Sequence, residues 1–145
     1  MPVDRASMLT QAEIYPLLPH AGDMVLIDRV ESWTAHDIVC ATRSHLRPDN
    51  PLRRGGRLSI VCAIEYGAQA MRIHGGLMSN EIETHGLLAS LRDIVFFGDR
   101  LDGVDSELVI CAAMLHRDRH GTIYDFSVGA DSGLLLTGRA SVIFR

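Results

Sequence analysis

The stretch Leu58–His74, LSIVCAIEYGAQAMRIH, decides the fold of this chain. It is long enough for a helix and apolar almost all the way round, and such a helix lies inside a fold rather than on its surface. We therefore predict a buried central helix over these residues, ended by Gly75 and Gly76. Within it Glu65 is followed one turn later by Gln69, on the same helix face. A buried carboxylate is costly unless it is paired, neutralised or used, so Glu65 is the first candidate for a functional group.

The segments around this helix carry strand patterns. Two apolar, alternating stretches precede it and four follow it, separated by turn residues. A helix of one or two turns is expected over Gln11–Leu18, because Pro19 stops it. The order predicts an α+β fold in one domain, residues 1–145, with an antiparallel sheet of five to six strands wrapped around one long helix. The predicted strands are Met24–Trp33, Asp37–Leu46, Leu87–Phe97, Glu107–Leu115, Thr122–Val128 and Leu134–Phe144.

Composition narrows the classes of protein. The net charge of -4, without a basic stripe, argues against nucleic-acid binding. No apolar run approaches the roughly 20 residues that cross a bilayer, and the N-terminus has no secretory pattern, so we expect a soluble cytoplasmic protein without membrane insertion. Cys40, Cys62 and Cys111 are scattered in apolar surroundings, which predicts buried free thiols. No clustered His/Cys ligand spacing indicates a metal site, and no Gly-rich phosphate loop indicates a nucleotide site.

Four motifs stand in order along nearly the whole chain. They are LLPHAGDMVLIDRV at Leu17–Val30, AIEYGAQAM at Ala63–Met71, RDIVFFGDRL at Arg92–Leu101 and LTGRASVIF at Leu136–Phe144. Together they resemble the bacterial 3-hydroxyacyl-carrier-protein dehydratase family. The resemblance implies the hotdog fold and a dimer with two active sites at its interface. The sheet edge and the helix surface left uncovered by one sheet also favour dimerisation.

The loop before the helix departs from that family. Its members carry a catalytic histidine in a His-Phe-Pro-Gly loop, whereas this loop reads RPDNPLRRGGR, with Pro51 at the gapless position. The segments Gly56-Arg57-Leu58 and Ile64-Glu65-Tyr66 resemble the divergent dehydratase-like branch of aryl polyene and related polyketide-type clusters.

Dehydration of a 3-hydroxyacyl thioester needs a base, an acid and donors to the thioester carbonyl. The resemblance implies that Glu65 is the acid or base; the alternative is a structural carboxylate. His20 and His45 are candidates for the missing histidine. Their alternatives are a residue that orders the loop after Pro19 and an exposed residue at a strand end. The other histidines, at positions 36, 74, 85, 116 and 120, lie near turns or helix ends and are expected to be solvated.

The candidates for substrate binding are two glycines before the predicted helix and one glutamine within it. Gly55 and Gly56 precede the helix, and they could let a thioester approach backbone N–H groups closely. Gln69 could orient Glu65 or a water. Tyr66 is expected in the core or an interface.

A basic cluster stands beside the expected site entrance. Arg53, Arg54 and Arg57 could steer an acidic acyl carrier protein toward the site. The alternative is an ordinary solvated loop.

Three functions fit these residues. The first is a 3-hydroxyacyl-carrier-protein dehydratase that forms the 2-enoyl thioester, with the substrate on the carrier's phosphopantetheine and no cofactor of the protein's own. The second is a non-catalytic hotdog subunit paired with an active dehydratase, which the missing loop histidine favours. The third is an acyl thioesterase, in which a carboxylate activates water. The expected partners are an acyl carrier protein and a second hotdog subunit, in a homodimer or a heterodimer.

Overall fold

Seven strands form one antiparallel sheet in the computed structural model, which describes residues 8–18, 24–78 and 86–144. All six predicted strands are present, and the sheet exceeds the predicted five to six strands because a two-residue strand precedes them. The strands lie in the order β1-β2-β3-β5-β6-β7-β4. Their bounds are β1 Leu9–Thr10, β2 Arg29–Trp33, β3 Asp37–Thr42, β4 Gly86–Phe96, β5 Leu108–Arg117, β6 Gly121–Ala130 and β7 Gly133–Phe144.

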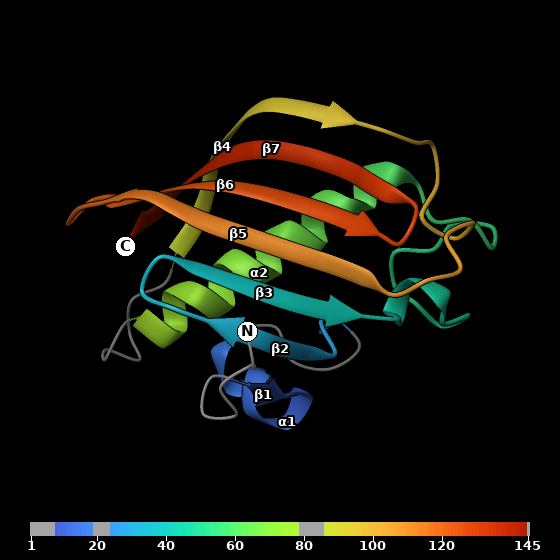
Figure 1. Cartoon of the computed structure of the whole chain (residues 1–145), viewed down its shortest axis with the longest axis horizontal. Coiled ribbons are helices and arrows are strands. Elements are labelled where there is room, and N and C mark those ends of the chain that lie inside the picture. Colours follow the sequence, from blue (N-terminus) through green and yellow to red (C-terminus); the bar gives the residue numbers. More distant parts are fainter. Residues whose placement is uncertain (1–7, 19–23, 79–85, 145) are drawn as a thin grey trace.

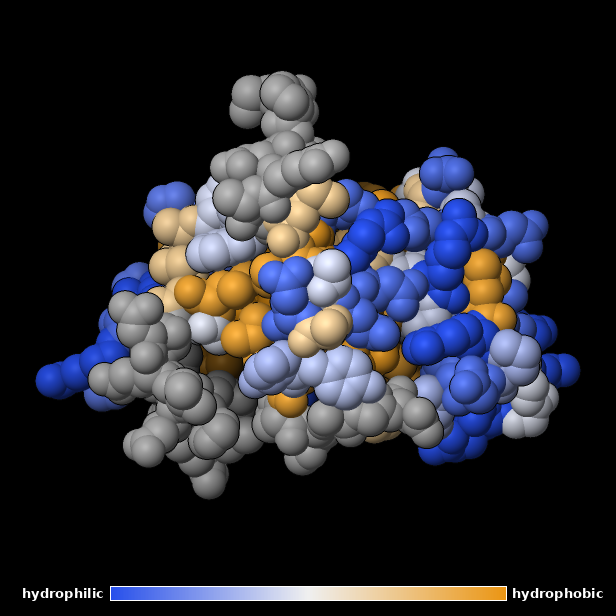
Figure 2. All heavy atoms as spheres, turned by 90° about the horizontal axis from the view of Figure 1, so that it is seen from below, coloured by the Kyte–Doolittle hydropathy of each residue, from blue (hydrophilic) through white to orange (hydrophobic). Residues whose placement is uncertain are grey.

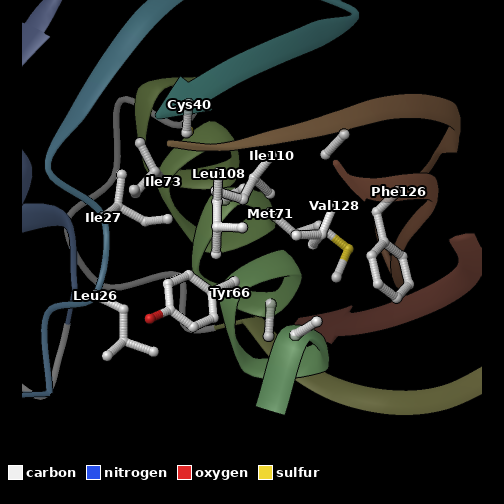
Figure 3. Close-up of a cluster of buried hydrophobic side chains, with 14 of the residues drawn as sticks. Leu26, Ile27, Cys40, Tyr66, Met71, Ile73, Leu108, Ile110, Phe126 and Val128 are labelled. Carbon is white, nitrogen blue, oxygen red and sulfur yellow. The ribbon is translucent and has the colours of Figure 1, made fainter. Parts of the chain in front are cut away.

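One long helix, α2 (Ala63–Met78), lies against the inner face of this sheet, and the sheet curves around it (Figure 1). Its buried side chains, among them Tyr66 and Ile73, meet apolar residues from β3, β5 and β6 (Figure 3). Gly67 permits the close approach, because a Cβ there would lie 2.5 Å from the Phe126 ring. The alternation of apolar residues along the strands thus builds the layer that covers the helix.

The helix boundaries differ from the predicted Leu58–His74. Leu58 and Ser59 precede the helical turns instead, and this segment bonds to the loop after β4: the Leu101 N–H donates to the Leu58 carbonyl at 2.8 Å, and the Ile60 N–H donates to the Asp99 carbonyl at 2.9 Å. A 3-10 turn, η4 (Ile60–Cys62), then leads into α2. The predicted stop at Gly75 and Gly76 is wrong, since α2 continues through both glycines to Met78.

The second predicted strand was too long at its C-terminal end. β3 ends at Thr42, where side chains take over the backbone donors: Asp28 accepts from the Arg43 N–H at 2.7 Å, and the Thr42 hydroxyl accepts from the Ser44 N–H at 3.0 Å. A 3-10 turn, η3 (Ser44–Leu46), follows.

The N-terminal short helix is present as predicted. It comprises α1 (Gln11–Ile14) and the 3-10 turn η2 (Tyr15–Leu17).

The two edges of the sheet differ. β1 is two residues long, whereas β4 has 11 residues and pairs on one side only, with β7. The described side chains of β4 are exposed or half-buried, and Val95 and Phe97 at its C-terminal end are 47% and 53% exposed. A long apolar edge strand is a surface for pairing with another chain.

None of the helices within the described ranges is long and apolar enough to cross a membrane.

Candidate functional site

Gln69 joins the central helix to the segment before β2. Its side-chain oxygen accepts from the Leu26 N–H at 2.9 Å, and its amide nitrogen donates to the Met24 carbonyl at 2.6 Å. Gln69 is buried, so both backbone groups would lack a partner without it. The structure therefore gives Gln69 a positioning task that the sequence had suggested only in part.

Glu65 lies one turn before Gln69, in the first turn of α2. The prediction that it is buried is wrong: the side chain is half-buried, because the sheet does not fully cover this part of the helix. Its Oε1 lies 3.5 Å from the Gln69 amide nitrogen, which is a long hydrogen bond. Glu65 is thus a partly exposed carboxylate whose neighbour on the helix is fixed in place.

Cys62 lies close enough to feel the charges of both Glu65 and Arg54. Burial raises the pKa of the Cys62 thiol, and Glu65 raises it further, while the nearby Arg54 guanidinium acts in the opposite direction. Cys62 and Cys111 are only half-buried, in contrast to the predicted burial, and Cys40 is buried. Arg54 of the basic loop therefore lies close to the helix start that carries Glu65.

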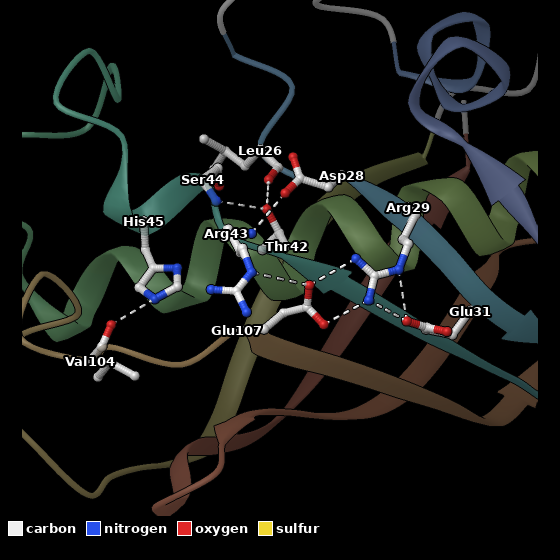
Figure 4. A network of polar contacts seen from close by, with 10 residues as sticks. All are labelled: Leu26, Asp28, Arg29, Glu31, Thr42, Arg43, Ser44, His45, Val104 and Glu107. Carbon is white, nitrogen blue, oxygen red and sulfur yellow. Dashed lines mark hydrogen bonds and ion pairs between the residues drawn. The ribbon is translucent and has the colours of Figure 1, made fainter.

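His45 lies in η3 and is fully buried, not exposed at a strand end. Its Nε2 is 3.0 Å from the Val104 carbonyl (Figure 4). A carbonyl only accepts, so Nε2 carries the proton and Nδ1 is the acceptor. That Nδ1 has no hydrogen-bond partner among the described residues, and burial lowers the pKa of the ring. His45 connects η3 to the loop before β5.

His74 is buried as well, which contradicts the prediction that it is solvated. Its Nε2 donates to the Thr34 carbonyl at 2.8 Å, and its Nδ1 accepts from the Tyr124 hydroxyl at 2.7 Å. Burial lowers the pKa of this imidazole and raises the pKa of Tyr124 to about 12. Both ring nitrogens are thereby used within the fold.

The remaining histidines divide into two groups. His36, His116 and His120 are exposed, as predicted. His20 and His85 lie outside the described residues.

Gly55 and Gly56 form a tight turn. Their φ values are 59° and 77°, and the flanking Arg54 and Arg57 exchange two backbone hydrogen bonds, of 2.8 and 3.0 Å. Positive φ at both central residues is the requirement of a type I′ turn, and glycine meets it without strain. The turn is exposed, and both glycine positions face open space.

The arginines of this loop have different surroundings. The half-buried Arg53 donates to the carbonyls of His45, Arg47 and Gly56, at 2.8 to 2.9 Å, and so holds the loop together. Arg54 and Arg57 are exposed. Figure 2 shows hydrophilic side chains gathered at the end of the molecule to which this loop belongs.

A buried cluster of polar side chains joins the loop before the helix to α2. The Tyr66 hydroxyl is 2.8 Å from the Ser44 hydroxyl and accepts from the Asn50 amide at 3.1 Å. Asn50 also donates to the Ser44 carbonyl and accepts from the Leu52 N–H, both at 2.9 Å. The sequence suggested a core position for Tyr66. Asn50 was missed because it lies in a polar, proline-containing loop whose packing against Tyr66 of the helix has no local signal.

A charged network lies outside the Glu65 region. Arg29 pairs with both Glu31 and Glu107, and its pKa is raised, mainly by the hydrogen bond to Glu107 (Figure 4).

No group of three or more His, Cys, Asp and Glu side chains within the described ranges is arranged to hold a metal ion.

A family model described as ApeP dehydratase matches residues 12–144. The chain belongs to the ApeP-like family. This confirms the resemblance to the dehydratase-like branch of aryl polyene clusters, and the chain is a dehydratase-like protein. No curated protein matches the chain.

The solved structures show the fold. The dehydratase heterocomplex ApeI:P from Xenorhabdus doucetiae matches with a TM-score of 0.74 at 23% identity, covering 90% of this chain and 89% of that one. A thioesterase from Haemophilus influenzae matches with a TM-score of 0.66 at 11% identity, covering 94% and 90%. AziG from S. sahachiroi matches with a TM-score of 0.65 at 16% identity, and the match covers 88% of this chain and 96% of that one. The predicted α+β hotdog fold is thus confirmed.

Proposed function

We propose that this member of the ApeP-like family takes part in removing water from a carrier-bound 3-hydroxyacyl thioester, with Glu65 as the acid or base. The observation that carries the proposal is the pair Glu65–Gln69. A carboxylate that a substrate can reach lies beside an amide whose two polar atoms are fixed by backbone groups at 2.6 and 2.9 Å. Positioned proton transfer of this kind accelerates reactions by roughly 10² to 10⁴-fold.

The reaction also needs a histidine or an equivalent group beside Glu65. The ring nitrogens of His74 are both bonded within the fold, and His45 is buried with Nε2 bonded to Val104. We propose that the histidine comes from a second hotdog subunit. The candidate within this chain is His20, which stands four residues before Met24 in the sequence.

We further propose that the second subunit pairs along β4. This edge offers unpaired backbone groups and exposed apolar side chains, among them Leu88, Leu91 and Val95. The solved complex of the Xenorhabdus protein is a heterocomplex, which supports a subunit of a different sequence.

A carrier protein would approach over the loop before the helix. Arg54 and Arg57 are exposed cations there, and Arg54 lies near Cys62 and the start of α2. Acidic carrier proteins would be attracted mainly through a faster association rate.

Three unpaired cysteines fit a reducing compartment, so we place the reaction in the cytoplasm.

The test is a mass-spectrometric assay with a 3-hydroxyacyl carrier-protein thioester. The chain is assayed alone and together with the ApeI subunit of the Xenorhabdus complex, as wild type, Glu65→Gln and His20→Gln. We expect loss of one water only when both subunits are present, and no loss with Glu65→Gln.

The other outcomes are equally informative. Activity of the isolated chain that His20→Gln abolishes would assign the histidine to this chain. Full activity of the Glu65→Gln complex would overturn the role of Glu65 and make the chain an accessory subunit. Release of free carrier thiol would indicate a thioesterase.

A further inference from the structure

The outer face of the sheet, which points away from α2, carries an ordered pattern of side chains. The register places four rows across the strands in the order β3, β5, β6, β7 and β4. The charged row is Asp37, Ala113, Asp125, Arg139 and Arg92; the neutral row beside it is Val39, Cys111, Ser127, Thr137 and Val95.

An apolar row flanks these two on one side, where Val109, Gly129 and Leu134 lie beside one another. On the other side Ile123 lies in a mostly polar row with His116, Ser141 and Ser90. Val109, Leu134 and Ile123 are 40%, 52% and 36% exposed.

The middle of this face is hollow. A cavity of about 450 Å³ lies over the small side chains of Ala113, Cys111 and Ser127. The half-exposed Arg139 borders it and donates to Asp125 at 2.8 Å, while Asp93, at a bulge in β4 with a φ of 55°, contributes a second negative charge near the guanidinium. The face therefore carries a cation, Arg139, at the border of a depression that Asp125 and Asp93 also line.

We propose that this face binds the same face of a second copy of the chain, about a two-fold axis that runs along β6. Such an axis places β6 opposite itself, β5 opposite the second copy's β7, and β3 opposite its β4. Aligned packing of two sheets, about 30° apart, is an ordinary arrangement of sheet faces.

Under this operation Asp125 of β6 comes opposite its own copy, and the Arg139 guanidinium beside each Asp125 offsets the repulsion between the two carboxylates. The other charged residues of the row meet complementary partners. Arg139 lies over the second copy's Ala113, whose neighbours across the register are Asp37 and Asp125. The long cation thus enters a depression that has a small floor and is lined by the carboxylates of Asp93 and Asp125, with Asp37 beside Ala113 on the neighbouring strand. At the strand edges, Asp37 comes opposite the second copy's Arg92.

The neutral and apolar rows match as well. Cys111 lies opposite Thr137, Val109 opposite Leu134, and Ile123 opposite its own copy. A two-fold axis perpendicular to the strands would set the charged row against the neutral one or, if it ran along the charged row, would place Asp37 opposite Asp37 and Arg139 opposite Arg139. Charge complementarity therefore selects the axis along β6.

The face is large enough for a stable contact. β5 and β6 are each 10 residues long. With a rise of ~3.3 Å per residue and strands ~4.8 Å apart, five strands cover on the order of 600 Å² per copy. Two copies would bury on the order of 1,200 Å², the lower end of specific interfaces. The β4 edge stays free, so this contact is independent of the proposed pairing along β4.

The experiment exchanges the two facing residues. Sedimentation velocity on the full chain measures its assembled mass as wild type, Ala113→Arg, Arg139→Ala and the double variant. Ala113→Arg puts two guanidinium groups face to face and should halve the mass of the wild-type assembly. Arg139→Ala should raise the dissociation constant at least tenfold. The double variant restores one arginine opposite one alanine, so it should recover the wild-type mass.

Gly103→Arg is the matched control. It adds the same side chain at an exposed loop position that faces open space, and the mass should not change. Circular dichroism verifies that each variant is folded.

Three results would overturn the proposal. They are an unchanged mass with Ala113→Arg, a double variant that stays dissociated, and a wild-type mass that changes only when the other hotdog subunit is added. Dehydration is assayed on the same samples. We expect Ala113→Arg to leave it intact, so failure of the face contact is distinguishable from failure of the proposed function.

Discussion

The two halves of α2 each present an ionisable side chain, and their surroundings are opposite. Glu65 in the first turn is half-buried and has one long hydrogen bond, to Gln69. His74 near the other end is fully buried, with both ring nitrogens bonded at 2.7 and 2.8 Å. A group whose polar atoms are all used by the fold has none left for a substrate. The comparison therefore favours the first half of the helix as the place of the proposed chemistry, and it gives His74 in the second half a structural role.

The sharpest way to test this division is Glu65→Gln. If Glu65 transfers a proton, turnover should fall by about 10² to 10⁴-fold. The free energy of unfolding should change by less than about 1 kcal/mol, because the lost charge interacts with the helix N-terminus and makes only a long hydrogen bond, to Gln69. Initial rates and urea denaturation measure the two effects.

Glu31→Gln is the control for that substitution, since Glu31 is a surface carboxylate paired with Arg29. Equal losses of turnover in both variants would remove the distinction of Glu65.

His74→Ala should show the reverse behaviour. The substitution leaves the Tyr124 hydroxyl and the Thr34 carbonyl without their partner and opens a cavity, so we expect a loss of about 3 kcal/mol in unfolding free energy. Turnover per folded molecule should be unchanged. The exposed His116→Ala should cost less than about 0.5 kcal/mol. A large loss of turnover at unchanged stability would contradict the assignment.

Gln69→Glu should lower both turnover and stability, because Gln69 lies beside Glu65 and also joins α2 to the segment before β2. A carboxylate still accepts from the Leu26 N–H but cannot donate to the Met24 carbonyl, which costs about 1–3 kcal/mol. It also adds a negative charge one turn from Glu65, so turnover should fall.

The matched control for that variant is Gln11→Glu, which loses a longer bond, 3.3 Å, to the Ile27 carbonyl. It should leave turnover unchanged. A Gln69→Glu protein with wild-type turnover would show that Glu65 needs no positioning.

The smallest effect is a pH dependence of stability. Burial lowers the pKa of both His45 and His74 below the value of about 6.5 expected in the unfolded chain. As the pH falls below about 6.5, the unfolded chain binds protons that the folded chain does not, so stability decreases. The slope should reach at most about 1.4 kcal/mol per pH unit for each histidine.

Urea denaturation between about pH 7.5 and pH 5 measures that slope, above the range in which ordinary carboxylates titrate. His74→Gln should reduce it by about half. An identical slope in that variant would mean that His74 titrates normally.

Local patterns predicted much of this molecule. The alternation of apolar residues located six strands, and the Glu-x-x-x-Gln spacing placed Glu65 and Gln69 on one helix face. Several expectations about burial were wrong: Glu65, Cys62 and Cys111 are less buried than predicted, and His74 is buried rather than solvated. His74 is buried because Gly75 and Gly76 do not end α2, so it lies within the covered part of the helix.

The sequence by itself determined the order of the elements and the residue types in the candidate site, because periodicity and turn residues act over a few positions. The tertiary structure decided which of those residues have free polar atoms. The bonds that matter join distant positions: Gln69 to Met24 across 45 residues and His74 to Tyr124 across 50. The row that holds Ala113, Asp125 and Arg139 likewise follows from strand register. Such pairings depend on how the sheet folds over the helix, and no local pattern encodes them.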